Sequence, residues 1–400
     1  MNLKEQLEII RGEPIQEFDG EPMDIPCIET SDAEKLCKNP VVSVHMITYN
    51  HEPYIRQAIE GVMMQKTDFE FELIIGEDAS QDKTREICFE YQKKYPDKIR
   101  VLWWHENLYK INGNGRRVTA RCRGEFIAFC EGDDYWTDPL KLQKQVDVMR
   151  THLSVGICFA HTKIAYQDTG LILEEKDRAL EIGLISGKEF SKMCLFGDII
   201  GKVYPNASRR TLSALIRRDV FVAAKEKYNE VFSMALRLGD TTCWLGCCGI
   251  GDVYLLKDVI GVYRVHSGGV TNMFKGGLLS DGIIVRIYFM ITQWGFSVEE
   301  SIKIFRDQIF LSRILGCEYL SSAEQKLKYK KIKNDQNFIG FSGFRFLGYL
   351  ICLKFGVFGS LSKRICDVIF YHIKFKSRIF EKKILDKINS YSTDKKIGVL

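Results

Sequence analysis

The chain has 400 residues and a net charge of +5, and 46% of its residues are hydrophobic and 27% are charged. This length and composition exclude a disordered chain and allow one large domain with an appendage, or two domains, because a sizeable core can be buried. The charge is uneven: residues 326–400 carry 17 Lys and Arg against 5 Asp and Glu, a net charge of +12, so residues 1–325 carry −7.

Residues 1–40 contain four prolines and few periodic apolar positions. We therefore expect a lead-in segment that packs on the surface or is partly mobile. The first thirty residues are acidic and have no apolar run, which does not predict a secretory signal. The 13 cysteines of the chain are irregularly spaced, so we expect reduced core residues in a cytoplasmic protein.

From residue 41 onward, strand patterns alternate with helix patterns. Apolar and β-branched runs predict strands over residues 41–47, 71–76, 99–104 and 126–130. Helical spacing of apolar residues predicts a helix over residues 54–65 and a second one that Ser80 caps, while residues 112–115 predict a loop. Strands and helices that alternate with short connections predict an α/β fold with a doubly wound, mostly parallel sheet flanked by helices.

Three polar clusters follow predicted strand ends, at Thr48–Glu52, Glu77–Asp82 and Glu131–Asp134. Ligands of doubly wound sheets bind beyond the carboxyl ends of the strands. Although the clusters come from distant stretches of the chain, we expect them to converge on one edge of the sheet and to form a site there.

The Glu131–Asp134 cluster places carboxylates at the end of an apolar strand. Mg²⁺ and Mn²⁺ bind oxygen ligands and keep positions for phosphate oxygens, so these carboxylates fit a divalent cation that bridges to a diphosphate. The alternative is a solvated acidic turn that caps the helix near Pro139, although like charges repel each other in such a cap.

The other two clusters suit a nucleoside. The carboxylate of Asp78 fits an acceptor for the edge of uracil or guanine, whereas Ser80 and Asp82 fit an ordinary helix N-terminus. Tyr49 offers a ring that can stack on a base, and Thr48 and Asn50 offer polar groups to the ribose. Taken alone, these last three residues also fit an ordinary strand-to-helix turn.

Further along the chain, helical spacing predicts a helix over residues 138–152, and strand patterns follow at residues 155–160 and 212–216. Asp240 offers a carboxylate that can take a proton from an acceptor hydroxyl. An apolar run over residues 253–265 leads to His266, whose imidazole can meet a diphosphate or a metal; a buried, hydrogen-bonded histidine is the alternative. Helical spacing then continues from about residue 282 to 333.

Several common motifs are absent. The glycines at 113 and 115 begin a pattern like G-x-G-x-x-G but lack the third glycine and do not follow the first strand, which argues against a dinucleotide fingerprint. The chain contains no G-x-x-x-x-G-K-[ST], H-E-x-x-H or G-x-S-x-G motif. This disfavours a P-loop protein, a zincin and a serine hydrolase.

The basic tail is also apolar in part. Residues 338–358 are rich in Phe, Leu, Ile, Tyr and Gly, but Arg345 and Lys354 leave no uncharged stretch of the ~18 residues that span a bilayer. We expect residues 338–390 to form helices that lie on an anionic membrane surface. The alternative is a helical subdomain that packs on the body with a solvated basic face. A nucleic-acid partner is not expected, because no recognised binding module accompanies the tail.

Together these motifs resemble those of the family 2 glycosyltransferases of the GT-A fold, over about residues 41–272. The segments that carry the resemblance are Val42–Asn50, Ala58–Val62 with Gln65, Phe71–Ser80, Gly124–Ala128, Glu131–Trp136, Asp138-Pro139, Lys141-Leu142, Gly239-Asp240 and Tyr263–His266. The sequence departs from the usual family pattern at Glu77, where an aspartate is common, and at Gly239, where a glutamate is typical.

The resemblance implies roles for the residues at matching positions. The nucleoside pocket would be lined by Thr48, Tyr49, Asn50 and Glu52, and Asp78 would contact the base. Asp133 would approach the ribose or donor sugar, Asp134 would be the main ligand of Mg²⁺ or Mn²⁺, and His266 would lie near the diphosphate or metal. Asp240 would be the general base of an inverting displacement.

The resemblance thus implies a metal-dependent glycosyltransferase with a nucleotide-sugar donor and a saccharide or lipid-linked saccharide acceptor, in polysaccharide or lipopolysaccharide synthesis. We divide the chain into a lead-in (1–40), a catalytic domain (41–275) and a helical region (276–400), in a cytoplasmic protein whose tail can lie on the inner face of the membrane. Two alternatives are a nucleotidyltransferase, which would release pyrophosphate, and a non-catalytic, degenerate glycosyltransferase that acts as a scaffold.

Overall fold

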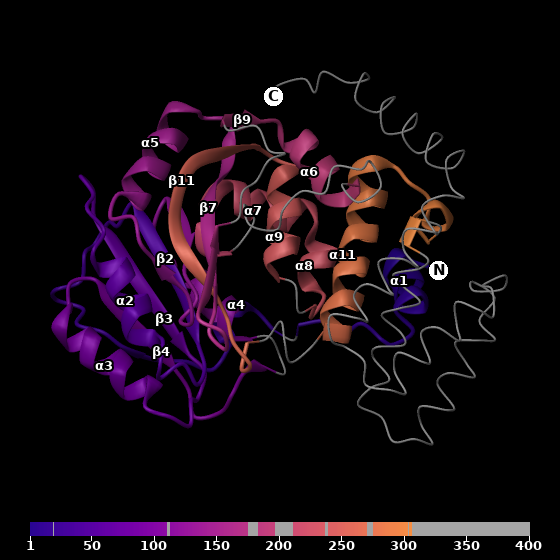
Figure 1. Ribbon diagram of the computed structural model, residues 1–400. Coiled ribbons are helices and arrows are strands. Elements are labelled where there is room, and N and C mark those ends of the chain that lie inside the picture. The colour runs from indigo at the N-terminus through magenta and orange to yellow at the C-terminus, as the bar shows by residue number, and fades with distance from the viewer. Residues whose placement is uncertain are drawn as a thin grey trace.

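The computed structural model describes residues 1–18, 20–109, 113–174, 183–196, 211–236, 239–269, 275–302 and 304–305. These residues form one eleven-stranded sheet with helices on both faces, which confirms the expected α/β class (Figure 1). Residues 338–390, which we expect to form basic helices, lie outside the described residues, as does most of the helical region expected over 276–400.

The first half of the sheet is parallel. Its strands are β2 (Val42–Thr48), β3 (Phe71–Glu77), β4 (Ile99–Trp103) and β5 (Phe126–Phe129), in the spatial order β4-β3-β2-β5. Helix α2 (Ile55–Met63) connects β2 to β3, and α3 (Thr84–Lys94) connects β3 to β4. These strands match the runs that predicted them, because β-branched and apolar side chains suit strands covered on both faces.

The second half of the sheet is mixed. β10 (Leu215–Arg217) is antiparallel to β5 and to β7 (Val155–Tyr166), β7 is parallel to β11 (Asp252–Val265), and β11 is antiparallel to β6 (Tyr135–Trp136). Three short strands complete the sheet: β1 (Ile28–Thr30) pairs with β4, β8 (Leu171–Glu174) with β7, and β9 (Gly183–Ile185) with β11. Because β6 directly follows the acidic cluster, its pairing with β11 places the end of that cluster beside β11.

Helices cover both faces of the sheet (Figure 1). One face packs against α2, α3 and α5 (Lys141–Thr151), and the other against α4 (Gly113–Ala120), α6 (Gly187–Phe196), α7 (Arg218–Lys227) and α9 (Gly239–Cys248). A further apolar core lies beyond α9, where α11 (Lys275–Trp294) packs with α1 (Leu3–Arg11) and α8 (Asn229–Ser233). Two 3₁₀ helices cover Pro22–Asp24 and Thr211–Ser213.

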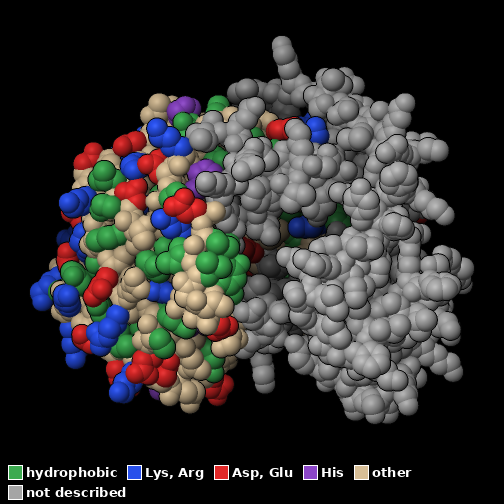
Figure 2. All heavy atoms as spheres, viewed as in Figure 1, with side chains coloured by type: hydrophobic (Ala, Val, Ile, Leu, Met, Phe, Trp, Pro, Cys, Tyr) green, Lys and Arg blue, Asp and Glu red, His purple; other side chains and the backbone are tan. Residues whose placement is uncertain are grey.

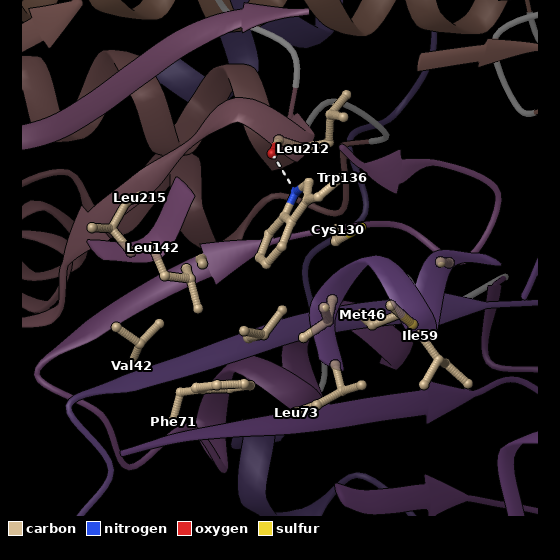
Figure 3. Close-up of a cluster of buried hydrophobic side chains, with 14 of the residues drawn as sticks. Val42, Met46, Ile59, Phe71, Leu73, Cys130, Trp136, Leu142, Leu212 and Leu215 are labelled. Carbon is tan, nitrogen blue, oxygen red and sulfur yellow. Dashed lines mark hydrogen bonds between the residues drawn. The ribbon is translucent and has the colours of Figure 1, made fainter. Parts of the chain in front are cut away.

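Successive side chains of a strand point to opposite faces of the sheet, so each enters the core on one face or the other. Met46 of β2, Leu73 of β3 and Ile59 of α2 point into one core, and Trp136 is buried in the same core (Figure 3). The indole Nε1 of Trp136 donates to the carbonyl oxygen of Leu212 at 2.9 Å. This buried ring therefore anchors the chain directly after the acidic cluster.

Two local expectations are wrong. Residues 113–115 begin helix α4 rather than continue a loop, because Asn114 donates its side-chain amide to the carbonyl of Gly76 and the carbonyl of Gly115 meets the imidazole of His45. Ser80 does not cap α3: that helix begins at Thr84, whose backbone N–H donates to Oδ1 of Asp82 at 3.0 Å. In the first case contacts with neighbouring strands outweigh local propensity, and in the second the hydroxyl of Ser80 accepts the backbone N–H of Asn50 in the neighbouring loop at 3.0 Å.

Part of the lead-in segment is packed into the body rather than on its surface. The side chain and backbone of Asn2 form a capping box with Glu5 at the start of α1. Leu7 is fully buried in the core that α11 shares, and Arg11 forms a 2.9 Å ion pair with the buried Asp281 of α11. β1 then adds an edge strand to the sheet beside β4.

The described surface shows no strong segregation of charge on the face in Figure 2, where Lys and Arg side chains are interspersed with Asp and Glu. The positive surplus of the sequence lies in residues 326–400, none of which is described. Within the described ranges, no helix is both long enough and apolar enough to cross a bilayer.

Lys141, the first residue of α5, is fully buried. Its ammonium lies 4.0 Å from the centroid of the Trp136 ring and has no hydrogen-bond partner among the described residues. One turn later, Oε1 of Gln145 also lacks a described partner. Burial lowers the pKa of Lys141 from 10.5 to about 7, because the charged form loses its hydration.

We expect Lys141→Met to raise the free energy of unfolding at pH 7 by about 1–3 kcal/mol, since it removes an unpaired buried polar group. The pKa of Lys141 is lower in the folded protein, so the unfolded chain binds more protons between pH 7 and 10.5 and the wild type gains stability as the pH rises through this window. The advantage of the variant should therefore be largest at or below pH 7 and shrink as the pH rises to 10.5, where only the cost of the unpaired neutral amine remains. Urea unfolding at several pH values measures this, and a difference that does not change with pH would contradict it.

Candidate functional site

The acidic cluster Glu131–Asp134 forms a turn between β5 and β6 that lies against the end of β2. The backbone N–H of Gly132 donates to the carbonyl of Ile47 at 2.9 Å. A Cβ on Gly132 would lie 2.6 Å from Oγ1 of Thr48 and 3.0 Å from Nδ1 of His51, so the turn packs directly on the first polar cluster. The backbone N–H of Asp78 donates to the carbonyl of Thr48 at 3.1 Å. The three polar clusters therefore meet at the carboxyl edge of the parallel strands.

Asp133 lies between two histidines from different parts of the chain. Its Oδ2 is 3.1 Å from Nε2 of His266, which follows β11, and 3.8 Å from Nε2 of His51, in the loop after β2. One ligand atom from each of these three residues lies within 4.8 Å of the other two. The ring of Tyr54 packs against His266 with 4.8 Å between centroids. Two imidazoles and a carboxylate therefore face one small volume.

The surroundings of Asp133 and His51 favour the states of these two groups that bind a cation. Burial opposes ionisation of Asp133, but the hydrogen bond with His266 and the neighbouring His51 outweigh it, so the pKa of Asp133 is lowered. Burial lowers the pKa of His51, and the charge of Asp133 offsets only part of this effect. An ionised carboxylate and a neutral imidazole are the forms that ligate a metal.

Glu131 connects this group electrostatically with Asp240. Burial, together with the nearby negative charges of Asp133 and Asp240, raises the pKa of Glu131 to about 8. Asp240 lies in the first turn of α9, where its Oδ1 accepts a hydrogen bond from the backbone of Thr241 at 2.6 Å. Oε2 of Glu131 is buried with no hydrogen-bond partner in the described part of the chain. Asp240 is thus within electrostatic reach of the acidic turn.

Asp134 has a different partner from Asp133. It is 2% exposed, and its Oδ1 accepts the backbone N–H of Arg264 at 2.8 Å, which ties the turn to β11. The main metal ligand expected from the sequence is Asp134, whereas the structure groups Asp133 with His266 and His51. The adjacent carboxylates of the turn therefore have different surroundings.

Asp78 lies at the end of β3 and is largely buried. Its Oδ1 accepts the backbone N–H of Leu108 at 2.8 Å, and its carbonyl accepts the side-chain amide of Asn107 at 2.9 Å. Burial raises its pKa, while the Leu108 N–H and the charge of Arg117 oppose the rise. The loop after β4 thus holds Asp78 at the sheet edge.

The loops after β2 and β3 hold each other. Oδ1 of Asn50 accepts the backbone N–H of Gln81 at 2.8 Å, and Oε2 of Glu52 accepts that of Lys83 at 3.2 Å. Among the described non-glycine residues, only Asn50 and Ala79 have positive φ, at 53° and 60°. Such conformations persist where surrounding contacts enforce them, often at functional sites. Tyr49 stays 41% exposed beside these loops.

No individual role is predicted from the sequence for His51 or Glu131. His51 directly follows the predicted nucleoside residues, and Glu131 opens the acidic cluster, so their positions were the only available signal. Their function depends on which strand ends lie beside each other, which residue types alone do not show. The predicted donor residues Thr48, Asp78 and Asp133 do lie around the same edge, with Asn50 and Glu52 in the paired loops.

Comparison with known sequences identifies a family for part of the chain. Residues 43–211 match the sequence model of Glycosyl transferase family 2. The uncharacterized protein Rv1520 of Mycobacterium tuberculosis is 43% identical over 127 residues, which are 32% of this chain and 36% of that protein. The putative teichuronic acid biosynthesis glycosyltransferase TuaG of Bacillus subtilis is 34% identical over 129 residues, 32% of this chain and 49% of that protein. The chain thus spans between about a third and a half of the length of these relatives.

Comparison with solved structures identifies the fold. The crystal structure of Staphylococcus aureus TarS in complex with UDP-GlcNAc aligns with a TM-score of 0.50 and 17% identity, over 73% of this chain and 79% of that one. At this identity the likeness is one of fold alone. Together with the family match, it confirms the GT-A fold expected from the sequence.

We expect Gly132→Ala to lower the free energy of unfolding by about 1–3 kcal/mol, because its Cβ would overlap Thr48 and force the acidic turn to shift. Gly115→Ala is the matched control: its Cβ meets His45 only at 3.9 Å, and alanine favours the helix by up to ~1 kcal/mol. Urea unfolding of both variants measures the difference. Equal stability of the two variants would contradict the close packing of the turn.

Proposed function

We propose that this chain, whose residues 43–211 belong to glycosyl transferase family 2, transfers a sugar from a nucleoside diphosphate donor to a saccharide or lipid-linked saccharide. The observation that carries the proposal is the group His51, Asp133 and His266 beside the ends of β2 and β3. TuaG is described as a putative glycosyltransferase of teichuronic acid biosynthesis, and TarS was solved with UDP-GlcNAc, so we extend a role in glycan synthesis and a nucleotide-sugar donor to this chain.

A divalent cation fits the His51, Asp133 and His266 group. Three ligand atoms lie within 4.8 Å of one another, and the buried Oγ1 of Thr48 and Nδ1 of His51 beside them have no partner among the described residues. Because two of the three donors are imidazoles, we favour Mn²⁺ over Mg²⁺, which prefers oxygen ligands. When bound, such an ion neutralises the charge that builds on the leaving diphosphate. In this arrangement Asp134 anchors the turn and Asp133 is the ligand.

The paired loops after β2 and β3 would bind the nucleoside. Asp78 can accept from the edge of the base, and the exposed ring of Tyr49 can stack on it. The side chains of Asn50 and Glu52 bind the backbone of the loop after β3, so we propose that these two residues stabilise the shape of the pocket. A pocket formed before binding costs less ordering entropy when the donor enters.

Asp240 is our candidate general base. It would take the proton of the acceptor hydroxyl as that oxygen attacks the anomeric carbon, which inverts the configuration in a single displacement. Its electrostatic coupling to Glu131 supports a position near the donor sugar. Glu131, whose raised pKa keeps it largely protonated at neutral pH, would donate a hydrogen bond there rather than compete for the proton.

The products of the reaction test the proposal. The protein is incubated with Mn²⁺ and UDP-, GDP- or dTDP-sugars, and binding is followed by the rise in melting temperature that a ligand of the native state produces. Release of free nucleoside diphosphate supports glycosyl transfer or donor hydrolysis at the same site. Release of pyrophosphate would indicate a nucleotidyltransferase instead. No binding of any donor and no release of product would overturn the proposal.

We expect Asp133→Asn to reduce the metal-dependent release of nucleoside diphosphate by about 10²–10³-fold, since it removes the charged ligand of the site. Asp147→Asn, on the exposed side of α5, is the matched control and should retain full activity. Chelation with EDTA should abolish the activity of the wild type, and Mn²⁺ should restore it better than Mg²⁺. Full activity of Asp133→Asn in EDTA would contradict the metal site.

We expect Asp240→Asn to lower turnover by about 10²–10⁴-fold, the usual contribution of a general base, while the KM for the donor stays unchanged. The amide keeps the shape of the carboxylate but cannot take a proton at neutral pH. Steady-state kinetics with saturating acceptor separate the two parameters. A large rise in the donor KM would instead assign Asp240 to donor binding.

A further inference from the structure

Arg264 contacts the acidic turn at two points. Its backbone N–H donates to Oδ1 of Asp134 at 2.8 Å, and its guanidinium donates to the carbonyl oxygen of Asp133 at 2.6 Å. The same side chain is largely buried, at 6% exposure. It therefore holds the backbone of the residue whose carboxylate faces the two histidines.

The remaining contacts of Arg264 fix the guanidinium in one orientation. It also donates to Oε1 of Gln57 on α2. Its carbon Cζ lies 4.3 Å from the centroid of the Tyr135 ring and 5.2 Å from that of Tyr54, and Tyr54 in turn packs on His266. Its acceptors are the backbone carbonyl of Asp133 and the side-chain amide oxygen of Gln57. The planar guanidinium of Arg264, a residue of β11, therefore connects the acidic turn to α2.

We propose that Arg264, oriented by Gln57, is a positioning residue that fixes the carboxylate of Asp133 between His51 and His266. The inference rests on the metal site of the proposed function. Ligand distances in metal sites vary by only about ±0.2 Å, so a small shift of the Asp133 backbone would weaken binding even though every ligand is still present. Lysine at position 264 has one ammonium and no planar fork, and it cannot reach both oxygens in the same geometry.

The direct test is the affinity for Mn²⁺ alone, measured on the full chain from the electron paramagnetic resonance signal of the free ion. We expect Arg264→Met to weaken Mn²⁺ binding by about 10- to 100-fold, the usual effect of losing a group that supports a ligand. Arg264→Lys should recover only part of this loss. Gln57→Ala, a change at an exposed position of α2, should weaken binding in the same direction while leaving the fold intact.

Arg217 offers a matched control. It also donates to a backbone carbonyl, that of Met149 at 2.6 Å, and its Cζ lies 5.1 Å from the centroid of an aromatic ring, that of Phe126. It lies on β10 opposite the start of β5, at the other edge of the sheet from the site. We expect Arg217→Met to lower the melting temperature without changing the affinity for Mn²⁺.

The outcomes separate the two proposals. If the wild type does not bind Mn²⁺, the metal site of the proposed function fails. If the wild type binds and both Arg264→Met and Gln57→Ala bind within twofold of it, the positioning role is overturned and the metal site remains. If Arg217→Met loses as much affinity as Arg264→Met, the effect is one of general stability and the positioning role is again overturned. Should Arg264→Met fail to fold, Gln57→Ala decides the question alone.

Discussion

The backbone hydrogen bonds of the Glu131–Asp134 turn determine where the polar groups of the site lie. On one side the N–H of Gly132 bonds to the end of β2, and on the other the carboxylate of Asp134 accepts the N–H of Arg264 on β11. β2 leads to His51 and β11 leads to His266, so the turn brings both histidines to the carboxylate of Asp133. Each strand end supplies one histidine to this group because the turn is fixed to both strands.

This arrangement leaves several buried polar atoms unsatisfied within the described residues, among them Oγ1 of Thr48, Nδ1 of His51 and Oε2 of Glu131. Buried polar groups without partners cost about 1–3 kcal/mol each, so a cluster of them at one sheet edge opposes folding unless a ligand satisfies them. Positive φ at Asn50 and Ala79 adds backbone strain at the same edge. A ligand that satisfies these atoms would recover part of that cost, which is why this edge, rather than the apolar cores, is the candidate site.

Much of the fold follows from local patterns. The runs at residues 41–47, 71–76, 99–104 and 126–130 became β2 to β5, because a strand covered by helices on both faces must be apolar throughout. The patterns failed where tertiary contacts override propensity. The glycine-rich start of α4 is held by Gly76 and His45, and the packed part of residues 1–40 depends on α11, nearly 270 residues away. No local window contains both partners of such contacts.

For the site, the sequence by itself determined that acidic and polar side chains follow parallel strand ends, and parallel strands necessarily place those ends at one edge. It did not determine which carboxylate of the turn meets the histidines. Asp133 and Asp134 are chemically alike and adjacent, and only the pairing of β6 with β11 turns Asp134 toward the backbone of Arg264 and Asp133 toward His51 and His266. The physical reason is that residue type fixes what a side chain can bind, whereas the direction in which it points depends on hydrogen bonds to strands more than a hundred residues away.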